Sequence, residues 1–308
     1  MPNWNDLLNE IRADSAESAH DRVRRKHLAR LFKHTQRNVI VYYSGWLRKA
    51  ELARRVPIQF GIVDDDKNGF MACIHKMDRS KGLDLILHTP GGDLAAVESL
   101  IDYLRSMFQT NIRAIVPQLA MSGGTMMALA AGEILMGKHS SLGPIDPQIN
   151  GAPAQAILEE FQQALRDVTQ NPASAAIWQP IIAKYTPTLV GACQKAGGWA
   201  NSLATNYLMT GMFQGLANAQ ALADGVVQVL GSHVQTLSHS RHISVAAAQQ
   251  LQLKVTPLEQ DQKLQDLVLT VHHACMHTLG STPAVKIIEN QMGIALIDTV
   301  QLTAGSAT

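Results

Sequence analysis

The sequence contains few cysteines and no cysteine motif. Cys73, Cys193 and Cys275 are odd in number, lie far apart and form no CxxC pair. This pattern argues against a disulfide framework and is typical of proteins from a reducing compartment. We therefore expect a cytoplasmic protein.

An excess of charge of one sign is also missing. The net charge is +1, so electrostatics give no reason to expect nucleic acid as a partner. The phosphate-binding patterns GxGxxG and GxxxxGK[ST] do not occur. His273 and His277 have the HxxxH spacing, but Ala274 stands where a zinc protease has glutamate, which favours packing at a helix face. We expect no cofactor and no metal.

Long uninterrupted apolar segments are absent as well. The first residues carry acids early and have no apolar core, so we expect no signal peptide. The longest apolar run, residues 114–136, is interrupted by Pro117, by glycines and by Glu133, and we interpret it as a buried strand followed by a helix. An integral membrane protein is not expected.

What the sequence does have is a regular alternation of strands and helices. Strands are expected at residues 83–88 and 112–117, and a helix is expected after each, at 93–108 and 122–131. This alternation predicts an α/β fold with a mostly parallel sheet and outer helices. With 308 residues, the chain can bury an ample core.

The chain divides into three segments. Residues 1–37 are expected to form a helical, basic amino-terminal arm with leucines that include Leu28 and Leu31. We interpret this arm as solvated and amphipathic or as an oligomer contact, and we leave association with a membrane surface open. Residues 38–300 form the main domain, and residues 301–308 are a tail.

The most informative features are two glycine turns, each placed between a strand and a helix. The first holds Gly91 and Gly92, and the second holds Ser122 followed by Gly123 and Gly124. In a parallel sheet both turns fall at the carboxyl ends of their strands, so the amides of one turn can face the serine of the other. Ser122 is therefore a candidate nucleophile, and the amides of Gly123 and of Gly91 or Gly92 are candidate oxyanion donors. The simpler interpretation of Ser122 is a helix cap.

The segments HTPGGD, AMSGGT and SSLGPIDPQ resemble the serine dehydrogenase proteinase family, which is related to signal peptide peptidase A and to the proteolytic subunit of the Clp protease. The resemblance runs at least from about residue 39 to residue 148, and VHHACMHTLGSTPAVKIIEN near the end also resembles that family. It implies a Clp/crotonase-type fold of repeated ββα units. It also implies that TPGG supplies an oxyanion donor, that SGG supplies the nucleophile, and that the chain is a homo-oligomer acting on a peptide or protein substrate.

The general base is harder to place. In the Clp subunit a histidine follows the nucleophilic serine, but the corresponding place near Asp146 holds no histidine. In the signal peptide peptidase A branch a later lysine acts instead, which leaves Lys138, Lys184 and Lys195 as candidates. We favour Lys184, whose apolar neighbours could desolvate the amine and lower its pKa, and Lys195 is the second choice. Asp146 is a candidate for an orienting carboxylate or a brace of its own turn.

The sequence thus predicts a serine peptidase with a Ser-Lys dyad and a backbone oxyanion hole. Two alternatives remain. A crotonase-like acyl-CoA enzyme shares the fold and the oxyanion hole without needing Ser122, and a catalytically silent scaffold could bind peptides in the same groove.

Overall fold

The computed structural model describes residues 9–12 and 19–300. Apart from a helical turn at residues 9–12, the helices are α2 (Ala19–Thr35), α3 (Ala50–Arg55), α4 (Asp66–Ile74), α5 (Leu94–Phe108), α6 (Gly123–Leu129), α7 (Ala154–Gln170), α8 (Ala175–Ile182), α9 (Leu189–Thr210), α10 (Ala219–Leu230), α11 (His233–Thr236), α12 (Val245–Gln250) and α13 (Gln262–Ser281). The strands are β1 (Asn38–Ser44), β2 (Leu83–His88), β3 (Ile112–Val116), β4 (Leu119–Ala120), β5 (Glu133–Met136), β6 (Ser141–Leu142), β7 (Gln148–Ile149), β8 (Ala152–Pro153), β9 (Ile243–Ser244), β10 (Val255–Pro257), β11 (Ala284–Asn290) and β12 (Ala295–Thr299).

The centre of the molecule is a seven-stranded sheet of order β10-β5-β3-β2-β1-β11-β12. The strands from β10 to β1 all pair in parallel, and β11 is antiparallel to both of its neighbours. The expected α/β class with a mostly parallel sheet is confirmed. β11 was not anticipated, although Gly280 and Pro283 mark its boundary with the preceding helix.

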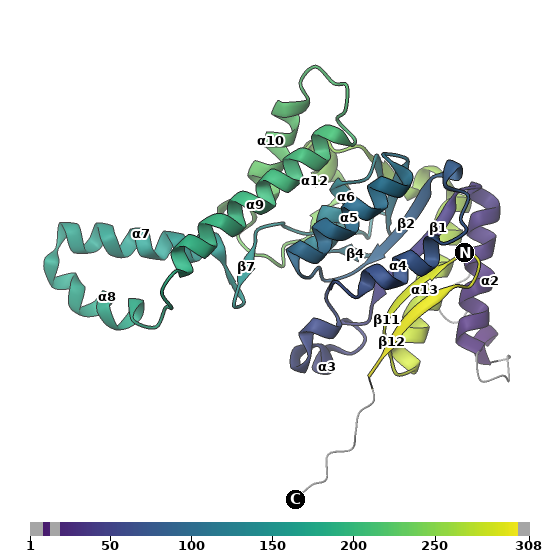
Figure 1. The fold of residues 1–308 in the computed structure, drawn as a ribbon, viewed down its shortest axis with the longest axis horizontal. Helices are drawn as coiled ribbons and strands as arrows, with labels where there is room; N and C mark the ends of the chain where they lie inside the picture. Colours follow the sequence, from purple (N-terminus) through teal and green to yellow (C-terminus); the bar gives the residue numbers. More distant parts are fainter. Residues whose placement is uncertain (1–8, 13–18, 301–308) are drawn as a thin grey trace, which may run out of the picture.

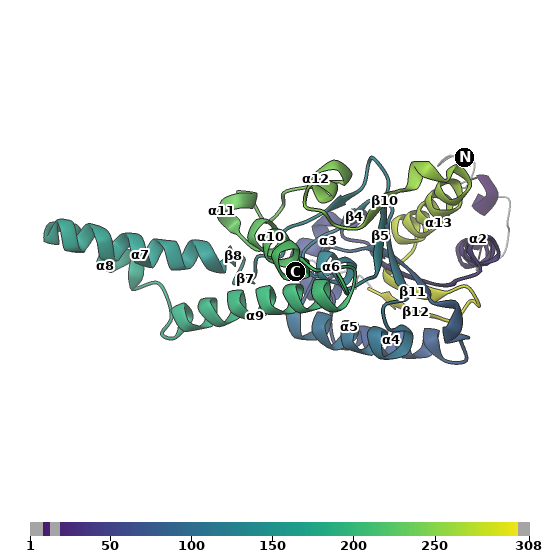
Figure 2. The ribbon, with the colours of Figure 1, turned by 90° about the horizontal axis from the view of Figure 1, so that it is seen from above.

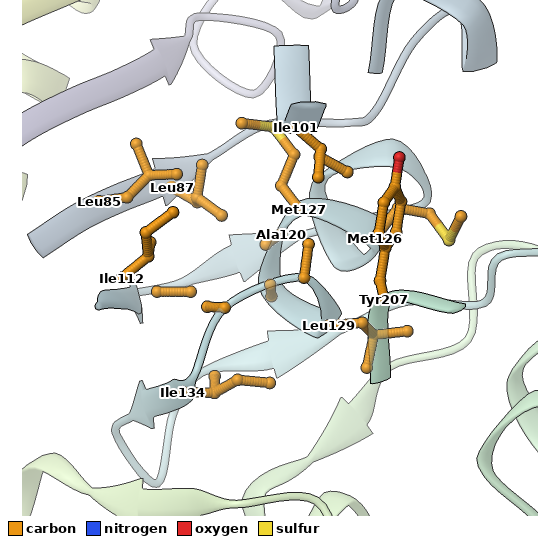
Figure 3. Packing of buried hydrophobic residues seen from close by; sticks show 14 of the residues in the cluster. Leu85, Leu87, Ile101, Ile112, Ala120, Met126, Met127, Leu129, Ile134 and Tyr207 are labelled. Carbon is orange, nitrogen blue, oxygen red and sulfur yellow. The ribbon is translucent and has the colours of Figure 1, made fainter. Parts of the chain in front are cut away.

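Helices cover both faces of the sheet (Figures 1 and 2). On β2, Leu85 and Leu87 pack into the larger core with α5 and α6, whereas Ile86 points to the opposite face, where it packs with residues of α2 and α13. This alternation follows from the two-residue period of a strand that is buried on both sides. Figure 3 shows the larger core, in which side chains from α5 and α6 meet those of the strands.

The amino-terminal segment packs more tightly than expected. α2 lies along α13, and both Leu28 and Leu31 are fully buried. A solvated arm would leave these two leucines exposed, so that expectation is wrong for them. The arm's other leucines, Leu7 and Leu8, lie outside the described residues, and so does the tail at 301–308. The interrupted apolar run forms β3, α6 and β5, as expected. Within the described ranges, no helix combines the length and the apolar content that crossing a membrane requires.

The helical pair α7 and α8 projects away from the sheet, and α9 leads back to it (Figures 1 and 2). α7 packs against α9, and a small cluster around Ile157, Leu189 and Cys193 forms its base. We call residues 154–188 the helical arm.

A cluster of aromatic and imidazole rings lies on the face of the sheet that packs against α2 and α13. His88 is fully buried, and its ring lies 4.4 Å from that of Trp46 and 5.4 Å from those of Tyr43 and His272. Among the described residues, neither ring nitrogen of His88 has a hydrogen-bond partner. Burial alone lowers the pKa of His88 to about 3 and, as the largest cause, lowers that of His272 well below its usual range.

This cluster makes stability depend on pH. An unfolded histidine takes up a proton near pH 6.5 whereas folded His88 stays neutral, so its stabilising contribution is complete above pH 6.5 and is lost as the pH falls toward 3. From pH 7.5 to pH 5 we expect His88 to lower the free energy of unfolding by about 2 kcal/mol. Urea denaturation of the wild type and of His88→Phe would measure this, with exposed His75→Gln as control. Equal pH slopes for His88→Phe and the wild type would contradict the assignment.

Candidate active site

The two glycine turns lie in direct contact at the carboxyl edge of the sheet. Thr89 pairs with Ala120 in an isolated parallel bridge, and the Met121 amide donates to the Thr89 carbonyl over 3.0 Å. Gly91 has a φ of +100°, and a Cβ on it would lie 2.7 Å from Cβ of Ser122. Only glycine fits where the backbone is left-handed and another turn approaches so closely.

Ser122 has a strained backbone and does not cap the helix that follows it. Its φ of 48° and ψ of −115° are strained for a residue with a side chain. It stands directly before α6, yet its side chain accepts no capping hydrogen bond from that helix. The serine is half-buried and lines a pocket. The capping interpretation therefore loses its physical basis, and Ser122 borders a space that a substrate can enter.

The amides at this edge differ in whether they are available. The Gly91 amide donates to Oγ1 of Thr89 over 3.2 Å, and the Gly124 amide donates to the Met121 carbonyl over 2.8 Å. Within the described part of the chain, no acceptor is recorded for the amides of Gly92 and Gly123. The Gly92 nitrogen lies only 3.4 Å from the position that a Cβ on Gly123 would occupy. Two free, adjacent donors beside a serine are what a developing oxyanion requires.

The pocket next to Ser122 has a volume of about 260 Å³. Its walls come from the two turns, from α6, from the segment at Ile145–Gln148 and from one face of α9, and the lining residues are Gly92, Asp93, Leu94, Ser122, Gly123, Met126, Ile145, Pro147, Gln148, Ala196, Trp199 and Ala200. The Trp199 indole donates to Oε2 of Glu98 on α5 over 3.1 Å, which fixes one wall. The lining is mainly apolar and, in the part of the chain that the structure describes, includes no lysine or histidine.

The structure does not bring the candidate lysines to Ser122. Lys184 is exposed at the end of the helical arm, so the desolvation expected from its apolar neighbours is not met within one chain. Lys138 is exposed too. Lys195 is exposed on α9, one residue from pocket-lining Ala196, and it lies within the helix rather than before a loop.

Asp146 has partners that sequence reasoning missed. It is buried, with Oδ1 2.8 Å from Nδ1 of His239 and Oδ2 2.9 Å from Nε2 of Gln148. Nδ1 of His233 lies 3.7 Å from Oδ2. Ile145 and Pro147 line the pocket whereas Asp146 does not, so this carboxylate braces the wall from behind. The sequence does not indicate this contact, because nothing in it links His239 to a carboxylate 93 positions away.

No group of three or more His, Cys, Asp or Glu side chains in the described residues could hold a metal ion. His277 is buried in α13 and His273 is half-buried there, which fits the packing role expected for them.

The contact between the turns leaves no room for a side chain at Gly91, and this can be tested. In Gly91→Ala, the new methyl group would also meet the Gly123 amide at 2.8 Å, so we expect the free energy of unfolding to fall by about 1–3 kcal/mol. Gly198→Ala is the matched control, since it lies within α9 with no atom within 4 Å, and it should raise stability by about 0.5–1 kcal/mol. Urea denaturation measures both, and equal effects would refute the close approach.

Comparison with known proteins adds the family. Two uncharacterized proteins of Methanocaldococcus jannaschii are 38% and 40% identical to this chain over 108 and 106 residues. These matches cover 35% and 34% of this chain and span only 37% and 36% of the length of those relatives. Residues 14–177, which include both glycine turns, match the family described as ClpP-like SDH-type serine proteinase. The chain belongs to this family of ClpP-like serine proteinases.

Proposed function

We propose that this protein is a serine peptidase in which Ser122 is the nucleophile and the amides of Gly92 and Gly123 form the oxyanion hole. The observation that supports this most strongly is the pairing of a strained, uncapped Ser122 with two adjacent amides that have no acceptor in the described chain. Of the two glycines left open by the sequence, Gly92 is favoured, because the Gly91 amide is occupied by Thr89. Gly91 contributes by allowing the close approach.

In the proposed reaction Ser122 Oγ forms a bond to the substrate carbonyl carbon, and its proton passes to a general base. The carbonyl oxygen becomes an oxyanion held by the two amides. When the intermediate collapses, the carbon–nitrogen bond breaks and the base returns its proton to the leaving amine. A water molecule then repeats the sequence on the acyl-enzyme, which releases the carboxylic acid and restores the serine hydroxyl.

Lys184 is our proposed base, with Lys195 as the alternative. A lysine accepts a proton only when it is desolvated enough to be neutral, and Lys184 is exposed within one chain. The proposed dyad therefore requires that the helical arm, or the arm of a second copy of the chain, brings Lys184 to the pocket. This is also our reason to propose a homo-oligomer.

The pocket supports a peptide substrate. Met126, Leu94 and Trp199 offer an apolar side chain a place beside the nucleophile, and Asp93 and Gln148 give the rim polar groups for a backbone. We propose a cytoplasmic location, because the three scattered cysteines form no disulfide framework.

A fluorophosphonate probe followed by intact-mass analysis tests the nucleophile. The wild type is expected to gain one covalent adduct, because an activated serine displaces fluoride from phosphorus. Ser122→Ala should gain none, whereas Ser140→Ala should behave as the wild type. Absence of an adduct on folded wild-type protein would refute the proposed peptidase and favour a crotonase-like enzyme or a silent scaffold.

The base is tested by the rate of the same reaction. Lys184→Ala should lower the rate of adduct formation by about 10²–10⁴-fold, and Lys195→Ala should change it little. The reverse order would move the base to Lys195. If Lys184 acts on a second copy, a mixture of Ser122→Ala and Lys184→Ala chains should recover part of the rate, whereas neither variant alone reacts well.

A further inference from the structure

A fully buried group of polar side chains lies on the inner side of the first glycine turn. Asp66, at the start of α4, and Lys286, on β11, are each 1% exposed, and Nζ of Lys286 lies 2.7 Å from Oδ1 of Asp66. The hydroxyl of Tyr42, on β1, donates to Oδ2 of the same carboxylate over 2.8 Å. Burial, followed by the charge of Asp66, raises the pKa of Tyr42 well above its usual value, so the hydroxyl stays neutral and remains a donor.

One path runs from Asp66 to the turn through side chains. Oγ1 of Thr89 accepts from the Gly91 amide over 3.2 Å, and the buried Thr89 hydroxyl is near enough to Tyr42 to act on the pKa of its hydroxyl. Tyr42 in turn donates to Asp66, so the two hydroxyls lie between the carboxylate and the turn in a dry interior, where polar groups influence one another strongly.

A second path runs from the same carboxylate through the backbone. The Val63 amide donates to Oδ2 of Asp66 over 3.0 Å. Its neighbour Ile62 donates to the Gly91 carbonyl over 2.8 Å and accepts from the Asp93 amide over 2.9 Å. The first path therefore holds Gly91 at its nitrogen, and the second holds it at its carbonyl oxygen. The Gly92 amide, which follows that carbonyl, is left as the free donor.

We propose that Asp66, with Tyr42 and Thr89 as its link, is the positioning residue of the oxyanion turn. Its carboxylate fixes the turn so that the Gly92 amide is aimed beside Ser122 before a substrate arrives. Lys286 supplies the opposite charge that lets Asp66 remain in the core. None of these four side chains lines the pocket, so they act through the turn and do not touch the substrate. This inference rests on the proposed function of Ser122 and Gly92.

The sharpest variants remove the link and keep the ion pair. Tyr42→Phe deletes the hydroxyl between Asp66 and Thr89, and Thr89→Val deletes the acceptor of the Gly91 amide. Thr89→Ser keeps that acceptor and is the conservative rescue. Tyr43→Phe is the matched control, because Tyr43 is the next residue on β1, is equally buried and bonds instead to His272 on the opposite face.

The fluorophosphonate reaction, measured against probe concentration, separates the maximal rate of adduct formation from the concentration that half-saturates it. We expect Tyr42→Phe and Thr89→Val each to lower the maximal rate by about 10–100-fold while the half-saturating concentration stays within about twofold, since a misplaced donor affects the transition state. Thr89→Ser and Tyr43→Phe should react at nearly the wild-type rate. Equal maximal rates for Tyr42→Phe and Tyr43→Phe, in proteins with similar melting temperatures, would overturn the proposal.

Amide hydrogen exchange of the peptide that spans residues 89–93 gives a readout that does not need catalysis. Exchange should be faster in Tyr42→Phe and Thr89→Val than in the wild type, and unchanged in Tyr43→Phe. Unchanged exchange in all variants would overturn the positioning role. If the wild type forms no adduct at all, the proposed peptidase function fails, and the exchange result alone decides whether Asp66 holds the turn.

Discussion

The parallel pairing of β2 with β3 is the constraint on which the candidate site depends. The register places Leu85 beside Ala114 and Ile86 beside Ile115, so the two strands reach the same edge of the sheet together. The pairing then continues into the turns, where Thr89 meets Ala120. A shift of one residue in this register would separate the Gly92 amide from Ser122 and would also turn every side chain of β2 to the wrong face.

Glycine and strain follow from this pairing. Two turns can touch only where side chains are absent, and a Cβ on Gly92 would lie 2.1 Å from the Ile62 nitrogen. Ser122 must keep its side chain in the same crowded place, and its φ of 48° reflects that conflict. Strain of this kind costs on the order of 1–3 kcal/mol and persists because the sheet and α6 hold both ends of the turn.

The sequence predicted the parts of this arrangement that are local. A strand, a glycine turn and a helix can each be recognised in a short stretch of sequence. Two such units in succession place two turns at one edge of the sheet. The sequence did not predict the contacts between residues that lie far apart in the chain. Asp66 and Lys286 are 220 positions apart, and neither stands in a pattern that indicates a buried ion pair. Asp66 is the first residue of α4, and this is what places it in the core.

The burial expected for Lys184 is absent from the single chain for a related reason. Apolar neighbours in sequence desolvate an amine only if they pack around it, and those of Lys184 belong to the helical arm, which stands apart from the sheet in a single chain (Figure 2). A local pattern indicates burial where a helix packs on the sheet, as in α5, but it says little where a helix pair projects into solvent. Under the proposed function, a base on this arm would take its position from the assembly of chains and not from one chain alone.

The buried polar group under the first turn is hard to explain by stability alone. A buried ion pair is often no more stabilising than apolar residues of the same shape, because both charges lose their hydration. Ile40 on β1 and Ile288 on β11 are fully buried in the same strand pair, which also holds the buried polar residues Glu289 and Asn290. A sheet that needed only stability could be completed with apolar residues like these isoleucines at positions 42 and 286. What the polar group adds is direction: hydrogen bonds fix the peptide at Gly91 in orientation as well as in place, whereas apolar contacts would fix only its distance. An oxyanion donor needs that orientation, since its N–H must point to a charge that exists only during the reaction.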